Sequence, residues 1–231
     1  MTVTVNAGAI NPGAIIFDCD GVLVDSEAIV MRIEQAAIAE AGLSYSPQDY
    51  ATRFTGLSYD DFFAILDAEH RARFGRPLAR SLYERIKDDS VAAMERELEA
   101  VPGIADLVEI VTVPTAVASS SFPESLVMKL TKTGLHDRFA PHIYSTKLVA
   151  NGKPAPDIFL YAAERLGVAP SACAVIEDSV NGVRAAVAAG MTAWGFTGAG
   201  HADPGLADRL AAAGAESVFD SHAAIALRLS G

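Results

Sequence analysis

The sequence has few of the residues that build disulfide networks, zinc sites or membrane spans. It contains only two cysteines, Cys19 and Cys173, and both lie beside predicted buried strands. We expect them to be reduced and buried, rather than joined in a disulfide or reactive. The five histidines are scattered, without the paired spacing of a zinc site. No run of about 18 apolar residues occurs, which argues against a transmembrane helix.

Basic residues are also scarce relative to acidic ones. The chain has 18 Lys and Arg against 29 Asp and Glu, a formal net charge of −11 at pH 7. This charge argues against nucleic acid or an anionic membrane as a partner, although local cations or a metal can still bind a small phosphate. Residues 1–13 lack the basic and long apolar regions of a secretory signal. We therefore expect a cytoplasmic, monomeric protein that acts on a small molecule.

The pattern of apolar residues changes once along the chain. Residues 26–100 contain only helix-like periodicity, beginning at a helix that Ser26 can cap. Short strands then alternate with helices, which predicts an α/β, doubly wound parallel (Rossmann-like) sheet. The expected strands are 14–17, 114–118, 143–145, 173–176, 192–196 and 217–219, and the expected helices between them are 123–134, 157–166, 181–189 and 204–213. The core domain is thus residues 1–25 and 101–231, with an all-helical domain of residues 26–100 inserted after the first strand.

Three of these predicted strands end in polar residues. Asp18 and Asp20 follow the first, Ser119 follows the second, and Glu177 and Asp178 follow the fourth strand in chain order. In an open parallel sheet, ligands bind beyond the carboxyl ends of the strands, so these side chains are expected to meet. Carboxylates and a hydroxyl are suitable for a magnesium ion that holds a phosphate.

Each of these residues also has a simpler structural explanation. Asp20 and Gly21 are ordinary turn residues. Ser119 and its two serine neighbours could cap the helix that starts at Pro123. Asp178 or Ser179 could cap the helix that follows them. A lone lysine in a loop, such as Lys153, is usually solvated. Residue types alone leave these alternatives open.

Four segments, taken in order, resemble the motifs of the haloacid dehalogenase superfamily. Residues 17–26 (Phe-Asp-Cys-Asp-Gly-Val-Leu-Val-Asp-Ser) are similar to its first motif, and Ser119 after a strand matches its second. Residues 152–159 (Gly-Lys-Pro-Ala-Pro-Asp-Ile-Phe) resemble the third motif, and residues 177–182 (Glu-Asp-Ser-Val-Asn-Gly) the fourth. The helical insertion matches the position of the cap that lies between the first and second motifs in the β-phosphoglucomutase-like subfamily.

The resemblance implies a role for each catalytic residue. Asp18 would be the nucleophile that forms an aspartyl-phosphate, and Asp20 the general acid and base. Lys153 would neutralise the phosphate and the nucleophile. Ser119, with Ser120 as a neighbour able to share the role, would donate a hydrogen bond to a phosphate oxygen.

The resemblance also implies a cofactor and a substrate-contacting loop. Magnesium would be held by Asp18, by the backbone carbonyl of Asp20 and by Asp178, with Glu177 acting through metal-bound water. Gly56 lies in a segment similar to the cap loop that contacts substrate in relatives, although a plain turn between helices explains it equally well.

Asp20 favours phosphatase activity over dehalogenation, because dehalogenases of the superfamily lack this second aspartate. Two cap residues of the mutase, an arginine and a histidine, are replaced here by Tyr59 and Val30. We therefore predict a phosphatase for small phosphorylated metabolites, with sugar or sugar-acid phosphates as substrates. The alternatives are a β-phosphoglucomutase-type mutase and a non-catalytic metabolite-binding module.

His201 follows a predicted strand near the edge of the sheet where the acidic residues are expected to meet. We expect it on the surface, with substrate contact as the alternative.

Overall fold

The computed structural model describes residues 11–46, 49–50, 53–54 and 59–230. The chain forms two compact units. The α/β unit comprises Met1–Asp25 and Glu99–Gly231, and the helical unit comprises Ser26–Leu98. None of the helices in the described ranges has the length and apolar character needed to span a bilayer.

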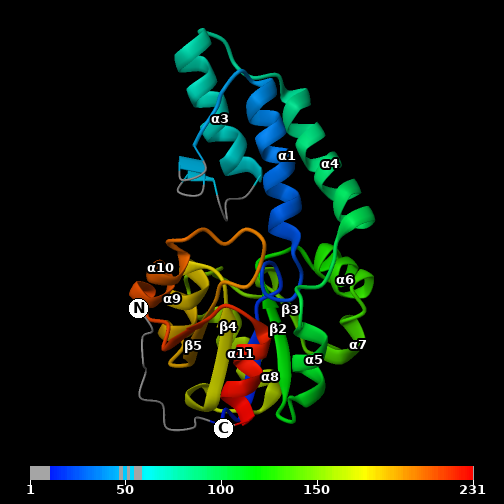
Figure 1. The fold of residues 1–231 in the computed structure, drawn as a ribbon, viewed down its shortest axis with the longest axis vertical. Helices are drawn as coiled ribbons and strands as arrows, with labels where there is room; N and C mark the ends of the chain where they lie inside the picture. Colours follow the sequence, from blue (N-terminus) through cyan, green and yellow to red (C-terminus); the bar gives the residue numbers. More distant parts are fainter. Residues whose placement is uncertain (1–10, 47–48, 51–52, 55–58, 231) are drawn as a thin grey trace. The chain divides into compact units, whose positions relative to one another are not determined.

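The α/β unit is built on a six-stranded sheet in which every neighbouring pair is parallel. The strand order is β3-β2-β1-β4-β5-β6 (Figure 1). The strands are β1 (Ala14–Phe17), β2 (Thr115–Ser119), β3 (Ile143–Ser145), β4 (Cys173–Glu177), β5 (Thr192–Phe196) and β6 (Ser217–Phe219). The predicted α/β, doubly wound parallel fold is confirmed.

Helices pack on both faces of this sheet, so its central strands are buried and apolar. The connections from β3 onward run along the sheet in the opposite direction to those from β1 to β3. Because such crossovers are right-handed, the two sets of helices lie on opposite faces. One set is α8 (Asp157–Leu166), α9 (Val180–Ala188) and α10 (Leu206–Ala213); the other is α5 (Ile104–Ile110), α6 (Pro123–Lys132), α7 (His136–Phe139) and α11 (His222–Ser230). Cys19 and Cys173 are free and buried, as expected.

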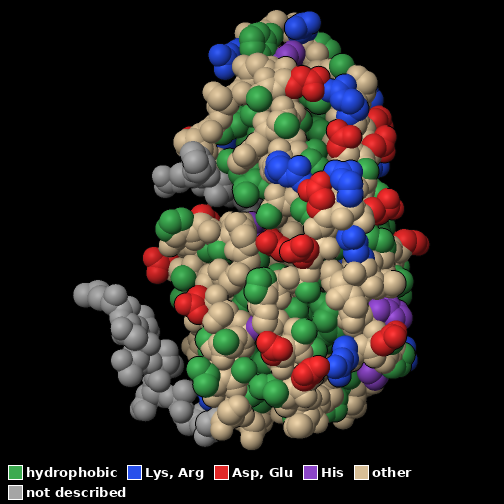
Figure 2. Space-filling view, turned by 45° about the vertical axis from the view of Figure 1, so that its right-hand side comes forward, with side chains coloured by type: hydrophobic (Ala, Val, Ile, Leu, Met, Phe, Trp, Pro, Cys, Tyr) green, Lys and Arg blue, Asp and Glu red, His purple; other side chains and the backbone are tan. Residues whose placement is uncertain are grey.

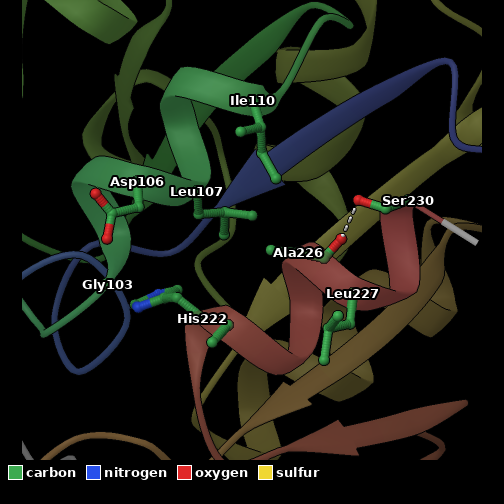
Figure 3. A pocket seen from close by; sticks show the side chains of 9 residues that line it. Gly103, Asp106, Leu107, Ile110, His222, Ala226, Leu227 and Ser230 are labelled. Carbon is green, nitrogen blue, oxygen red and sulfur yellow. Dashed lines mark hydrogen bonds between the residues drawn. The ribbon is translucent and has the colours of Figure 1, made fainter.

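Helices α5, α7 and α11 are not among the helices expected from the sequence. Helices α5 and α11 pack against each other and leave an apolar groove of about 420 Å³ between them (Figure 3). Leu107 and Ile110 of α5 face Leu227 of α11 across this groove. It contains none of the acidic residues that the sequence singles out.

The helical unit contains α1 (Ser26–Glu40), α3 (Tyr59–Phe74) and α4 (Arg80–Glu97), and α4 packs against both of the others. Ion pairs from Arg32 to Glu97 and from Arg85 to Glu40 join α1 to α4 at the surface. Figure 2 shows Lys and Arg side chains interspersed with Asp and Glu over this unit. Exposed pairs of this kind contribute little to stability, so the apolar packing holds the helices together.

The boundary after the helical unit lies two residues earlier than expected from the sequence, because the two connecting segments pair with each other. The Asp25 amide donates to the Glu99 carbonyl over 3.1 Å, and the Val101 amide donates to the Leu23 carbonyl over 2.9 Å. Val24 and Ala100 also form an antiparallel bridge. Glu99 and Ala100 therefore belong to the α/β unit.

Glu34 is a buried carboxyl in the helical unit and makes stability depend on pH. Burial raises its pKa to about 7, although the hydroxyl of Tyr50 donates to it over 2.5 Å. The unfolded chain ionises this group near its ordinary pKa of 4.5. Between these two values the folded state binds more protons than the unfolded state, so stability falls as pH rises.

We predict that Glu34→Gln removes this loss. Between pH 4.5 and pH 8, burial of Glu34 should lower the free energy of unfolding of the wild type by about 3 kcal/mol. The variant should not show this decrease when both proteins are unfolded with urea across this pH range. Glu95→Gln, at an exposed position of α4, is the control and should follow the wild type. If the free energy of unfolding changed with pH in the same way for wild type and Glu34→Gln, the prediction would be wrong.

Candidate active site

Three buried carboxylates meet at the carboxyl ends of β1 and β4. The strands are adjacent and parallel, with Phe17 beside Ile176, so the residues that follow each strand emerge together. One oxygen each of Asp18, Glu177 and Asp178 lies within 4.8 Å of the others. The sheet thus brings together acidic residues that are about 160 positions apart in the sequence, as the strand ends predicted.

Lys153 links this acidic cluster to the end of β2. Its Nζ lies 2.5 Å from Asp18 Oδ1 and 2.6 Å from Glu177 Oε1, and it donates to the Ala118 carbonyl over 2.9 Å. The ammonium is almost fully buried, with its side chain 5% exposed. The loop before α8 therefore places a cation between two carboxylates from different strands.

The second oxygen of Glu177 is also engaged, because the amide and the hydroxyl of Ser179 donate to Oε2 over 3.0 and 2.9 Å. The Ser179 hydroxyl in turn accepts from the Gly182 amide over 3.0 Å and caps α9. Glu177 therefore holds Lys153 and the start of α9 in place.

Burial and repulsion raise the pKa values of the clustered acids. Burial raises the pKa of Asp18 well above its usual value, and the carboxylates of Glu177 and Asp178 raise it further, while Lys153 lowers it. Burial also raises the pKa of Asp178, against the lowering effect of His201. Burial lowers the pKa of Lys153, but Asp18 and Glu177 together hold it above its usual value. The ammonium therefore stays charged, and it favours the ionised form of Asp18.

His201 corrects an expectation from the sequence, because it is not on the surface. Its side chain is 7% exposed, and its Nε2 lies 3.0 Å from Asp178 Oδ2. Gly21 lies against the same pair: a Cβ there would be 1.9 Å from Asp178 Oδ2 and 2.7 Å from His201 Cε1. With its φ of 78°, Gly21 permits both the turn after β1 and this close approach.

The Asp20 side chain is bonded to groups outside the cluster of three carboxylates. Its Oδ2 accepts from the Ser121 hydroxyl over 2.7 Å, and its Oδ1 is paired with the Lys129 ammonium. Lys129 is not among the site residues expected from the sequence. A signal was present, because Lys129 shares the buried face of α6 with Leu126 and Leu130. A lysine on an apolar helix face implies a buried partner.

The remaining predicted residues are less tightly grouped. Ser119 ends β2 and is buried, and its Oγ accepts from the Ser121 amide over 3.0 Å. Ser120 is exposed beside it. Gly56 lies outside the described residues. The structure therefore brings Asp18 and Lys153 together with the acids at positions 177 and 178. Ser119 lies at the end of the adjoining strand β2.

The cluster has the chemistry of a divalent-cation site. When all three carboxylates are ionised, the Lys153 ammonium offsets one of their negative charges, and a divalent cation would balance the other two. Carboxylate and carbonyl oxygens are the donors that Mg²⁺ and Ca²⁺ prefer. The residues present therefore fit such an ion.

The family model for haloacid dehalogenase-like hydrolases matches residues 12–190 of this chain. The chain belongs to this family. Among curated members, the 6-phosphogluconate phosphatase of Escherichia coli K12 is 30% identical over 83% of this chain and 85% of its own length.

Two solved structures of haloacid dehalogenase-like proteins are similar throughout. The one from Agrobacterium tumefaciens is 41% identical with a TM-score of 0.84, and covers 95% of this chain and 99% of its own. The one from Deinococcus radiodurans, determined with bound phosphate and sodium, is 36% identical with a TM-score of 0.81, and covers 94% of each chain. Family membership confirms the resemblance inferred from the four motifs.

Gly182 lies against the carboxylate of Glu177. A Cβ at this position would be 1.8 Å from Glu177 Cδ and Oε1, so the carboxylate would have to leave Lys153 and Ser179. Replacing glycine by alanine within a helix usually stabilises it by about 1 kcal/mol. At Gly182 we expect the same replacement to destabilise the protein instead.

We predict that Gly182→Ala lowers the free energy of unfolding by about 1–3 kcal/mol, because it breaks buried hydrogen bonds to a charged group. Urea denaturation at neutral pH measures the change. Asn181→Ala, at the exposed neighbouring position, is the control and should shift stability by less than about 0.5 kcal/mol. A Gly182→Ala protein as stable as the wild type would contradict the role of this contact.

Proposed function

We propose that this member of the haloacid dehalogenase-like family is a magnesium-dependent phosphatase for sugar or sugar-acid phosphates, acting through an aspartyl-phosphate. The observation that carries the proposal is the buried contact between Asp18 Oδ1 and Lys153, at the point where three strand ends supply acids and a serine. The Lys153 ammonium favours the ionised form of Asp18, which is the form suited to attack phosphorus. The phosphate bound to the Deinococcus relative is consistent with a phosphate site in this fold.

In the proposed first step, a carboxylate oxygen of Asp18 attacks phosphorus and the bond to the sugar oxygen breaks. The departing oxygen takes a proton from Asp20, which leaves the sugar alcohol and a phosphorylated Asp18. Lys153 offsets the negative charge of both the nucleophile and the transferring group. Ser119 ends the neighbouring strand and would donate its hydroxyl to a phosphate oxygen, with Ser120 beside it.

In the proposed second step, water attacks the same phosphorus and the bond to Asp18 breaks. Asp20, now ionised, takes the proton from this water, which regenerates both acids and releases phosphate. One group therefore gives a proton in the first step and takes one in the second.

Asp18, Asp178 and the backbone carbonyl of Asp20 would hold magnesium, and Glu177 would act through a bound water. Both oxygens of Glu177 already accept protein hydrogen bonds, which supports this indirect role. When bound, the ion supplies positive charge that stabilises the negative charge of the transferring phosphoryl group.

The substrate class rests on the relatives, one of which is named a 6-phosphogluconate phosphatase. The helical unit is inserted between β1, which precedes Asp18, and β2; it would act as a cap and supply the residues that select the sugar. The mutase alternative would require transfer of phosphate between positions of one sugar instead of its release.

We predict that the wild type releases inorganic phosphate from sugar phosphates in the presence of magnesium, and that EDTA abolishes the release. Asp18→Asn should lower kcat by about 10³-fold or more, because the amide is a poor nucleophile. The control Asp106→Asn, on the exposed side of α5, should retain wild-type activity.

A phosphate-release assay over a panel of phosphorylated sugars and sugar acids measures these rates. Full activity of Asp18→Asn would contradict the assignment of the nucleophile. Interconversion of sugar-phosphate isomers without release of phosphate would favour the mutase.

A further inference from the structure

Lys129 is a buried cation outside the carboxylate cluster. It projects from the inner face of α6, and its side chain is 6% exposed. Placing an ammonium at such a site costs several kcal/mol unless it is paired and hydrogen-bonded. The side chains of Asp20 and Ser121 provide these partners.

Lys129, Ser121 and Asp20 form a closed triangle of contacts. The ammonium is paired with Asp20 Oδ1 and donates to Ser121 Oγ over 3.0 Å. The same hydroxyl donates to Asp20 Oδ2 over 2.7 Å. Each carboxylate oxygen of Asp20 therefore has its own donor, which fixes both the direction and the rotation of the carboxyl group.

The backbone of Ser121 is itself held by two strand ends. Its amide donates to Ser119 Oγ over 3.0 Å, and its carbonyl accepts from the Ser145 hydroxyl over 2.6 Å. Residues 119 and 145 end β2 and β3, which are paired in register at these positions. The support for the Asp20 carboxylate is thus anchored to the sheet.

We propose that Lys129, together with Ser121, is a positioning residue that orients the Asp20 carboxyl group for proton transfer. This inference rests on the proposed function, in which Asp20 gives a proton to the leaving oxygen and later takes one from water. Proton transfer requires the two heavy atoms to lie within hydrogen-bond reach, so it is sensitive to the orientation of the carboxyl group. Without the lysine, Asp20 loses the ammonium paired with its Oδ1, and the carboxyl group can rotate away.

Leaving groups that differ in their need for a proton separate this role from general support of the fold. A sugar alkoxide is a poor leaving group and requires the proton of Asp20. The 4-nitrophenolate ion leaves without one. The value of kcat/KM covers the steps up to loss of the leaving group, so it isolates the first proton transfer.

The experiment compares Lys129→Met with the wild type on 4-nitrophenyl phosphate and on the sugar phosphate that the wild type hydrolyses best. We expect kcat/KM for the sugar phosphate to fall about tenfold or more, because general acid catalysis is impaired. The value for 4-nitrophenyl phosphate should stay within about threefold of the wild type. Ser121→Ala should change the two values in the same unequal way, by a smaller factor.

Lys132→Met is the matched control, since Lys132 lies on the same helix and is exposed. It should leave both values unchanged. Equal losses on the two substrates, or no loss on the sugar phosphate, would overturn the assignment of Lys129. If Lys129→Met does not fold, the comparison of kcat/KM on the two substrates is made with Ser121→Ala, and equal losses there would overturn the proposal.

Failure of the proposed function would look different. A wild type that hydrolyses neither substrate in the presence of magnesium would overturn the phosphatase proposal, and the role of Lys129 with it. An active wild type whose Lys129 and Ser121 variants lose activity equally on both substrates would overturn the positioning role alone.

Discussion

The position of the Lys153 ammonium between Asp18 and Glu177 is the interaction on which the rest of the site depends. This one charged atom joins Asp18, which follows β1, to Glu177 at the end of β4. Three carboxylates within 4.8 Å would otherwise repel one another in a buried setting, which would favour their protonated forms. The ammonium lowers the pKa of Asp18 against the raising effect of burial and of the other two carboxylates, so it favours the ionised form of this group. A buried nucleophile and a buried cation therefore stabilise each other.

The topology of the sheet explains why this pairing is available. Strand β1 is central, with β2 on one side and β4 on the other, so the residues following all three strands emerge at one edge. The loop before α8 crosses this edge and delivers Lys153. The loop after β5 delivers His201 against Asp178 in the same way. Rigid strands fix the acids, while loops supply the groups that balance their charge.

The site contains two separate acid–lysine pairs with different surroundings. Asp18 with Lys153 lies among further carboxylates, whereas Asp20 with Lys129 lies beside the hydroxyl of Ser121. The two aspartates are two residues apart in the sequence, but β1 ends at Phe17 and the chain turns from Cys19 onward, so the two side chains contact different partners. This separation lets neighbouring carboxyl groups serve as nucleophile and as proton donor in the proposed reaction.

The sequence alone determined the fold class, the order of the strands along the chain and most of the acidic site. Short apolar runs ending in Asp, Ser or Glu are local signals, and α8 and β5 have the bounds expected from them. Helices α5 and α11 were missed because α5 has only seven residues, with no side-chain cap, and α11 depends on packing against it. The partners of Asp20 and Asp178 were also beyond local reasoning. Lys129 and His201 lie 109 and 23 residues away from them in the chain, so only tertiary packing decides which charges meet.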